Sequence, residues 1–460
     1  MASRLRATIV AIAVLLAACT STGTVTPLPP DMFAPTPSIG GVTPSTTIRP
    51  DPTTTANVER AMIYPVDPLT LDALPGFNPI PMGDWVWGHA SSNGAYFVAV
   101  VGDDDSGLAE IRLIDVAAWE QIGSWRGAPA SEPLVTDDGT IHYVGGIDDL
   151  IIIRGGTSEV STTLPTGWYP SGAGQMINGR FVSFGATSGA GTGLDHGSII
   201  AADIDAGSVT DIDLATVRIG SLEPDADEPW GGYLYAFPAV ALDAGRSRAL
   251  VVHADRDVVS VVDLDSGSVT DHEFSPTGSN PSVVSTTSIL SRSAAISADG
   301  SHLYVATQVG EIDVDDEVWT FTTTPTGVIT IDTATWRIIS SLQQPIGSIQ
   351  LSPDGTRILG TGYTGVEGSD TSEVEMSGLF VLETESLEVL AHHPPENPGQ
   401  WYGSFSFNER AGVGYVSTSA PQARVDVIDL ASGRIVNSQE GGEFIQMIGQ
   451  ISVLSVVRSP

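Results

Sequence analysis

Short apolar runs alternate with tight turns along the chain, from near residue 67 to near residue 449. The runs are rich in Val and Ile and too short for helices. Examples are 95–101 (AYFVAVV), 111–116 (IRLIDV), 249–253 (ALVVH), 258–264 (VVSVVDL) and 425–430 (VDVIDL). We find no convincing amphipathic helix among them. The pattern therefore predicts an all-β fold made of short antiparallel strands.

One kind of turn is an Asn-Gly or Asp-Gly pair, or a looser version of it, between two apolar runs. Asn-Gly and Asp-Gly supply the positive φ that a hairpin needs, so these turns join adjacent antiparallel strands. The eight turns centre on Gly94, Gly139, Gly179, Gly245, Gly300, Gly355, Gly412 and Gly449. We name the two strands that such a turn joins A and B.

The other kind of turn is an acidic residue followed four positions later by Gly, Trp or Leu. Its carboxylate can accept hydrogen bonds from the amides of the turn. These turns begin at Asp67, Asp115, Asp203, Asp263, Asp332, Glu383 and Asp429, and a degenerate copy lies near Arg154. They alternate with the first kind and join strands C and D.

Each unit is therefore a four-stranded meander, A-B-C-D, with a period of roughly 40–50 residues, which is typical of a β-propeller. The turn count predicts eight blades, or seven if one weak turn does not mark a blade. Asp67 has no A–B turn before it, and Gly449 has no C–D turn after it. Residues 444–457 should thus give strands A and B of one blade, and 60–74 its strands C and D. Closure by both termini removes two exposed sheet edges.

The N-terminus has the anatomy of a signal segment. Arg4 and Arg6 precede an apolar stretch, 7–16, that is too short to span a bilayer. The next residues, Leu-Ala-Ala-Cys19, resemble a bacterial lipobox. The resemblance implies cleavage before Cys19 and lipid attachment to it, which would tie the protein to the membrane. The alternative is an ordinary secreted protein with an incidental cysteine.

The chain thus divides into a signal peptide (1–18), a disordered tether rich in Thr, Pro and Ser (19–59) and a propeller domain (60–460). Cys19 is the only cysteine, so a disulfide within one copy is impossible. We expect the protein at the outer face of the bacterial cytoplasmic membrane, in the cell envelope.

Formal net charge is −36, and all 19 basic residues are Arg. A surface of this sign repels nucleic acid and anionic lipid headgroups, so a nucleic-acid partner is not expected. It suits an extracytoplasmic setting, although solubility alone is the plainer explanation.

Three stretches carry a recognisable repeat pattern: 296–307 (ISADGSHLYVAT), 351–359 (LSPDGTRIL) and 414–418 (GYVST). They resemble the repeats of bacterial YVTN-type and WD-repeat-like propellers. The resemblance covers the whole ring at the level of turns and implies the fold. It implies little about function, because propellers host binding, scaffolding and several chemistries.

In such a meander the A–B and C–D turns share one face of the ring, and the B–C and D–A connections share the other. The long insertions all fall on the second face, at 102–107, 186–197, 215–232, 310–327 and 364–378. Because function concentrates on variable loops held by a rigid scaffold, we expect the binding site there.

Aromatic residues just before the inner strands should ring the mouth of the channel on that face, where they could stack on sugars or grip a peptide. Packing between blades is the alternative. The ligand-binding candidates are Trp85, Trp87, His89, Trp168, Tyr169, Trp230, Tyr233, Tyr235, Trp401 and Tyr402.

Acidic clusters lie at 103–105, 223–228, 311–317 and 367–375. Carboxylates at alternate positions, such as Asp313, Asp315 and Glu317, can coordinate Ca²⁺. No complete calcium loop is present, and solvated loop charge is the simpler interpretation. No other cofactor is expected.

We find no metal-binding His motif, haem site, nucleophile elbow or phosphate loop. The leading hypothesis is a lipid-anchored propeller that binds a glycan, peptide or protein of the envelope. One alternative is a lactonase- or hydrolase-like enzyme that uses channel carboxylates, with or without a divalent metal. The other is a structural scaffold of an envelope complex.

Overall fold

The computed structural model of the chain describes residues 61–457 apart from short gaps. The gaps are 83–84, 92, 104–107, 128–132, 146–148, 155–156, 164–167, 171–173, 188–194, 222–234, 237, 277–288, 316–317, 369–371, 398–399, 420–422, 441 and 449–450. The predicted signal peptide, tether and Cys19 lie outside the described residues. Within the described part the helical segments are the 3₁₀ turns η2 (Ala244–Arg246) and η3 (Glu409–Ala411). No helix there is long and apolar enough to cross a bilayer.

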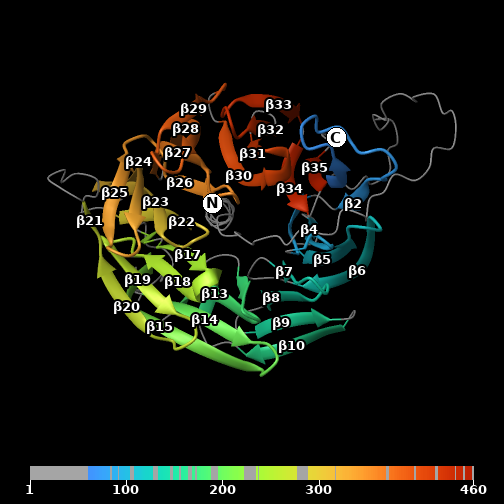
Figure 1. Cartoon of the computed structure of the whole chain (residues 1–460), viewed down its shortest axis with the longest axis horizontal. Coiled ribbons are helices and arrows are strands. Elements are labelled where there is room, and N and C mark those ends of the chain that lie inside the picture. The colour runs from blue at the N-terminus through green and yellow to red at the C-terminus, as the bar shows by residue number, and fades with distance from the viewer. Residues whose placement is uncertain are drawn as a thin grey trace.

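The strands form antiparallel meanders arranged around a ring (Figure 1). The first meander is β3 (Trp85–Ala90), β4 (Tyr96–Asp103), β5 (Leu108–Asp115) and β6 (Glu120–Gly127). The second is β7 (Leu134–Val135), β8 (Ile141–Gly145), β9 (Asp149–Arg154) and β10 (Thr157–Thr163). The third has β11 (Trp168–Pro170) and β12 (Gln175–Ile177) at its inner edge, then β13 (Arg180–Thr187), β14 (Asp195–Asp203), β15 (Ser208–Ser221) and β16 (Tyr235–Ala236). The fourth is β17 (Ala239–Asp243), β18 (Arg248–Val252), β19 (Val258–Asp263) and β20 (Val269–Glu273).

A nine-stranded sheet follows. It consists of β21 (Ser275–Pro276), β22 (Ile289–Ile296), β23 (His302–Asp315), β24 (Val318–Asp332), β25 (Arg337–Leu342), β26 (Ser348–Leu351), β27 (Arg357–Gly368), β28 (Ser372–Glu383) and β29 (Val389–His393). The next sheet is β30 (Trp401–Asn408), β31 (Val413–Ser419), β32 (Arg424–Asp429) and β33 (Ile435–Glu440). The last combines β34 (Gly442–Ile448) and β35 (Ile451–Val457) with β1 (Ala61–Val66) and β2 (Ile80–Met82).

Among the described residues, hydrogen bonding divides the ring into seven sheets, and seven is the blade number given above as the alternative. The nine-stranded sheet contains two successive meanders, β22 to β25 and β26 to β29, which are joined by pairing between β24 and β27. The eight units counted from the turns and the seven sheets therefore describe the same propeller.

The two ends of the propeller close the ring as predicted. Strand β1 pairs antiparallel with β35 over six residues, from Ala61 opposite Val457 to Val66 opposite Ser452 (Figure 1). The predicted position of the fourth strand was wrong. Val66 and Ala73 form an isolated bridge, which is not a strand. The strand next to β1 is β2, at Ile80–Met82. The connection is longer because residues 67–79 first form the Asp67 turn and then a loop.

The core lies between adjacent blades. One cluster joins the third and fourth meanders, with Val182 and Ile199 packed against Ala249 and Val251. The middle strands are buried on both faces, as in β32, whereas the outer strand β33 alternates half-buried and exposed positions. This explains why strands B and C read as continuous Val and Ile runs, since both of their faces are covered.

The C–D turns have the predicted chemistry. At Asp263, Asp332 and Asp429 the carboxylate accepts the amide of the residue three positions later, at 2.7 Å in each turn. The residue four positions after the acid has a positive φ in all seven clear copies, which are Leu71, Trp119, Gly207, Gly267, Trp336, Leu387 and Gly433. The copy near Arg154 links β9 to β10 across the undescribed residues 155–156.

The A–B turns follow a second rule. The Asp299 carboxylate accepts the Ser297 and Ser301 hydroxyls, each at 2.7 Å, and the Ser301 amide at 3.0 Å. The Ser301 amide, with these hydroxyls, lowers the pKa of Asp299 well below its usual range. The looser copy after Asp243 differs from prediction, because η2 shifts the positive φ from Gly245 to Ser247.

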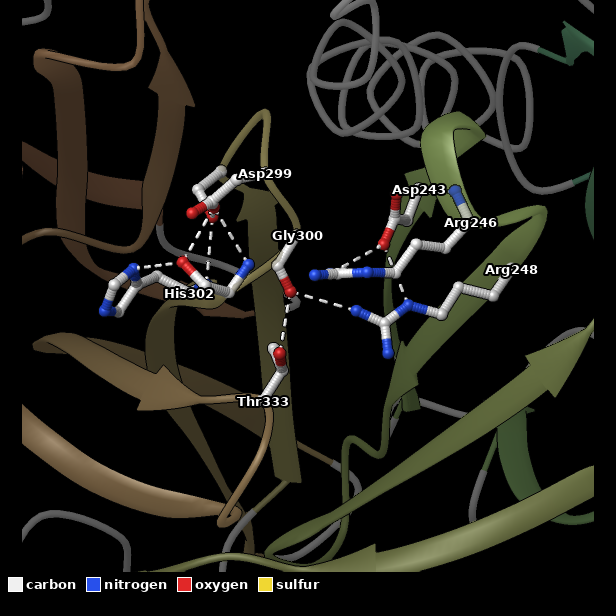
Figure 2. Close-up of polar contacts among 9 residues, drawn as sticks. Asp243, Arg246, Arg248, Asp299, Gly300, His302 and Thr333 are labelled. Atoms are coloured by element: carbon white, nitrogen blue, oxygen red, sulfur yellow. Dashed lines mark hydrogen bonds and ion pairs between the residues drawn. The ribbon is translucent and has the colours of Figure 1, made fainter.

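Arginines at the start of strand B tie neighbouring blades together on this tight-turn face. Arg248 donates to Asp243 at 2.8 Å and to the carbonyl of Gly300 in the next blade at 2.9 Å (Figure 2). Thr333 donates to the same carbonyl at 2.7 Å. In the same way Arg357 reaches Leu430, and Arg180 reaches Leu264. A guanidinium offers several donors in a fixed fork, which suits this bridging.

Candidate functional site

The B–C and D–A face carries the long connections, as predicted, but two of them, 310–327 and 364–378, consist mainly of strands rather than loops. Strands β23 and β24 continue as a hairpin beyond Thr307, and β27 and β28 continue beyond Gly362. A register shift marks the base of each extension. We call the two extensions together, residues 308–325 and 363–377, the platform.

Pairing between β24 and β27 makes the platform one sheet. Thr320 lies opposite Gly368, and Thr323 lies opposite Gly365. The strand order is β23-β24-β27-β28, so two neighbouring blades share their projecting part. A two-stranded hairpin alone is only marginally stable in water, whereas a sheet of four paired strands is more stable.

The described residues of the third and fourth acidic clusters lie in this sheet. Glu311 is opposite Thr322, which is opposite Val366, which is opposite Glu373. Asp313 and Asp315 occupy the next alternate positions of β23. Glu317 lies outside the described residues. Among the described residues no group of three or more His, Cys, Asp or Glu side chains is placed to hold a metal ion.

The aromatic candidates have different surroundings. Tyr402 is buried, at 2% exposure, and its hydroxyl lies 3.3 Å from the carbonyl of His393 and 3.4 Å from that of Pro394. Burial, with the nearby Asp426 charge, raises its pKa to about 12. Trp401 is half-buried, and its ring centroid is 5.4 Å from that of Tyr363 at the base of the platform. Of the neighbours Trp401 and Tyr402, Trp401 is the one that keeps substantial exposed surface.

The positions of the other aromatic candidates follow from the strands that contain them. Trp85 and Trp87 begin β3 and pair with Gly102 and Val100. His89 is half-buried on the same strand.

Trp168 and Tyr169 lie on β11. Tyr235 lies on β16, which pairs with β15, and so it does not lead directly into the inner strand β17. Trp230 and Tyr233 lie outside the described residues.

An ion-pair cluster near Tyr402 was not predicted. Arg424 donates to Glu396 at 2.7 Å and to the fully buried Asp426 at 3.0 Å. Ser438 donates to Asp426 at 2.6 Å. Glu396 belongs to the D–A connection that leads to β30, so the cluster fixes that connection to the blade. Arg424 and Asp426 are two residues apart on one strand, so their side chains lie on the same face. This spacing is the sequence signal from which their pairing could have been predicted.

A series of hydrogen-bonded polar side chains lies in the fourth blade. Arg256 donates to Nδ1 of the buried His253 at 3.0 Å, and Nε2 of His253 lies 2.7 Å from the Ser260 hydroxyl. Ser260 donates to Asp271 at 2.6 Å. The serine proton thus points to the carboxylate and not to the imidazole. This order differs from that of an activated serine nucleophile, in which the histidine accepts the serine proton.

Comparison with known proteins assigns the chain to no family. No protein-family model matches the chain, and no curated protein matches it.

Solved structures resemble the chain at low sequence identity, and each of the three that follow has a TM-score below 0.5. BamB from Moraxella catarrhalis is 10% identical, over 80% of this chain and 96% of that chain, with a TM-score of 0.47. The β-propeller domain of Cps50 (Swd1) from Myceliophteria thermophila is 12% identical, over 83% of this chain and 98% of that chain, with a TM-score of 0.43. The quinohemoprotein alcohol dehydrogenase ADHIIG from Pseudomonas putida HK5 is 12% identical, over 87% and 76%, with a TM-score of 0.48.

Proposed function

We propose that the protein is a lipid-anchored, extracytoplasmic propeller that binds a peptide or protein of the cell envelope through its B–C and D–A face. The anchor and the location are inferred from the lipobox-like sequence ending in Cys19. Binding at this face is inferred from the platform, which is the observation that carries the proposal.

The platform favours macromolecular recognition for a geometric reason. It places strands of two blades in one projecting sheet, whereas the opposite face consists of tight turns whose polar groups bond to one another. A rigid projecting sheet presents an extended surface at little entropic cost, because its strands are already ordered. A small substrate would be held better by a concave site.

The charge of the platform suggests the chemistry of the partner. The platform strands carry Glu311, Asp313, Asp315, Glu373 and Glu375. Complementary charge steers association and sets specificity, so a partner with a basic surface is expected. A glycan bound near Trp401 is the second possibility, and the same experiment separates the two.

Site-specific photo-crosslinking of the full-length protein in its own membrane tests the proposal. The crosslinker replaces Thr364 or Glu375, both exposed on the platform, and Ala431, which is exposed in a C–D turn, serves as the control. We expect one discrete protein adduct from the platform positions and none from Ala431. Adducts from Ala431 alone, or equal labelling of all three positions, would contradict the proposal. Adducts with glycan alone would identify the partner as an envelope polysaccharide rather than a protein.

A further inference from the structure

The chain contains the dipeptide Asn-Gly twice, in the A–B turns at Asn93–Gly94 and at Asn178–Gly179. The two copies have the same covalent chemistry and different surroundings. We infer that Asn178–Gly179 is a site of spontaneous deamidation and isoaspartate formation, and that the fold protects Asn93–Gly94 from the same reaction.

The reaction needs only the chain and water. The backbone nitrogen of the glycine attacks the Asn side-chain carbonyl carbon, a new N–C bond forms, and the side-chain nitrogen leaves as ammonia with the proton that the backbone nitrogen loses. Water then opens the five-membered imide at either carbonyl, which yields aspartate or isoaspartate. A glycine after the asparagine helps, because no Cβ hinders the attacking nitrogen.

Asn178 and Gly179 form an exposed two-residue hairpin loop between β12 and β13. Their φ values are +51° and +78°, and Ile177 pairs with Arg180 across the loop. A methyl group built on Gly179 meets no atom within 4 Å. Among the described residues, nothing holds the Asn178 side chain or the Gly179 amide in a hydrogen bond. The side chain and the attacking nitrogen are therefore free to approach each other.

At Asn93–Gly94, both the Asn side-chain oxygen and the attacking Gly nitrogen are held. Its side-chain oxygen accepts the Ser91 hydroxyl at 2.9 Å and the Ala95 amide at 2.8 Å. The Gly94 nitrogen, which would have to attack, donates to the Ser91 carbonyl at 2.9 Å, and Gly94 is buried. These bonds must break before the imide can form.

The position of Asn178 gives the modification a consequence. The next strand begins with Arg180, which bonds to Leu264, Ser247 and Asp265 of the neighbouring blade. Isoaspartate inserts one extra atom into the backbone of the loop, so it disturbs the pairing of Ile177 with Arg180 and weakens this link. Conversion to ordinary aspartate adds charge without lengthening the backbone.

The test is to age the folded full-length protein at mildly alkaline pH and to map both peptides by mass spectrometry, with enzymatic methylation of isoaspartate as a second readout. We expect Asn178 to convert roughly tenfold faster than Asn93, or more, because each bond lost at Asn93 costs about 1 kcal/mol. In denaturant the two sites should convert at similar rates. Equal rates in the folded protein, or faster conversion at Asn93, would overturn the inference.

Two variants sharpen the test. Ser91→Ala removes one bond to the Asn93 side chain and should accelerate conversion there by roughly fivefold, without change at Asn178. Asn178→Gln should abolish isoaspartate at this site and preserve the unfolding midpoint of the aged protein. Loss of stability on ageing to the same extent in Asn178→Gln would show that the loss does not come from modification at Asn178.

Discussion

The two faces of the ring are built by different rules. On the A–B and C–D face, turns repeat the same hydrogen bonds from blade to blade, and three arginines, Arg180, Arg248 and Arg357, each bond to the blade that follows their own. On the other face the connections differ in length, and two of them merge into the platform. One face therefore repeats its contacts from blade to blade, whereas the other face varies.

The largest effect should come from the tight-turn face. Asp243 is 5% exposed and accepts from Arg248 at 2.8 Å and from Arg246 at 3.4 Å. Asp243→Ala should lower the free energy of unfolding by roughly 3 kcal/mol, because it removes a buried carboxylate and leaves the half-buried Arg248 without its charged partner.

Glu396→Ala is the matched carboxylate deletion on the other face. Its side chain is 58% exposed, so we expect a loss below about 1 kcal/mol despite its 2.7 Å contact with Arg424. Urea unfolding of both variants gives the comparison. Similar losses would show that the two faces contribute alike to stability.

A second large effect concerns pH. Burial, with the Arg154 charge, lowers the pKa of His142 from 6.5 to about 4. The unfolded chain therefore binds more protons between these values, and stability falls as pH drops from about 6.5 toward 4, by up to roughly 3 kcal/mol for this one group. His142→Leu should flatten that part of the stability curve. An unchanged slope in the variant would remove His142 as the cause.

Two glycines at the same C–D turn position separate backbone strain from packing. Gly207 has a φ of +62° and nothing within 4 Å of an added methyl group, whereas at Gly433 that methyl group would lie 2.7 Å from Cβ of Ala391. Gly207→Ala should cost about 1 kcal/mol from strain alone. Gly433→Ala should cost roughly 1–3 kcal/mol more, because Ala391 must move. Equal losses in thermal unfolding would contradict this difference.

The turn carboxylates should make the tight-turn face sensitive to acid. The hydroxyl and amide of Thr335 lower the pKa of Asp332 below 3.8. A depressed pKa gives stability that is present above the unfolded value and is lost as pH falls below it. Asp332→Asn should therefore make acid unfolding below about pH 4 less steep. Circular dichroism measured against pH checks this. A steeper acid transition in the variant would oppose this account.

The smallest effect on stability is expected on the platform. Glu375 is exposed there, so Glu375→Lys should change the free energy of unfolding by less than about 0.5 kcal/mol. The same substitution reverses a charge on the proposed binding face and should weaken crosslinking from Thr364. Undiminished crosslinking would argue against a basic partner.

The sequence predicted the fold because the turns are local. An Asp or Asn before Gly, and an acid four residues before a positive φ, specify hairpins without reference to the rest of the chain. The pairing of β24 with β27 joins residues more than 40 positions apart and leaves no periodic signal. From the sequence alone, the two platform segments are therefore expected to be separate insertions.

The site was less predictable for a similar reason. Trp401 and Tyr402 are adjacent on a strand, so they point to opposite sides, and Tyr402 lies in the core. The ion pair of Arg424 with Glu396 joins a strand to a connection 28 residues earlier, and only the folded chain shows it. The aromatic ring at the channel mouth stays a prediction, as does lipid attachment at Cys19.

Hydrogen exchange of backbone amides in the full-length protein, with and without detergent-solubilised envelope, tests the central claim most directly. The account predicts slower exchange in the platform strands, at 311–315 and 372–376, and unchanged exchange in the C–D turns at 263–267 and 429–433. Slower exchange confined to the C–D turns, with the platform unaffected, would contradict the assignment of binding to the variable face.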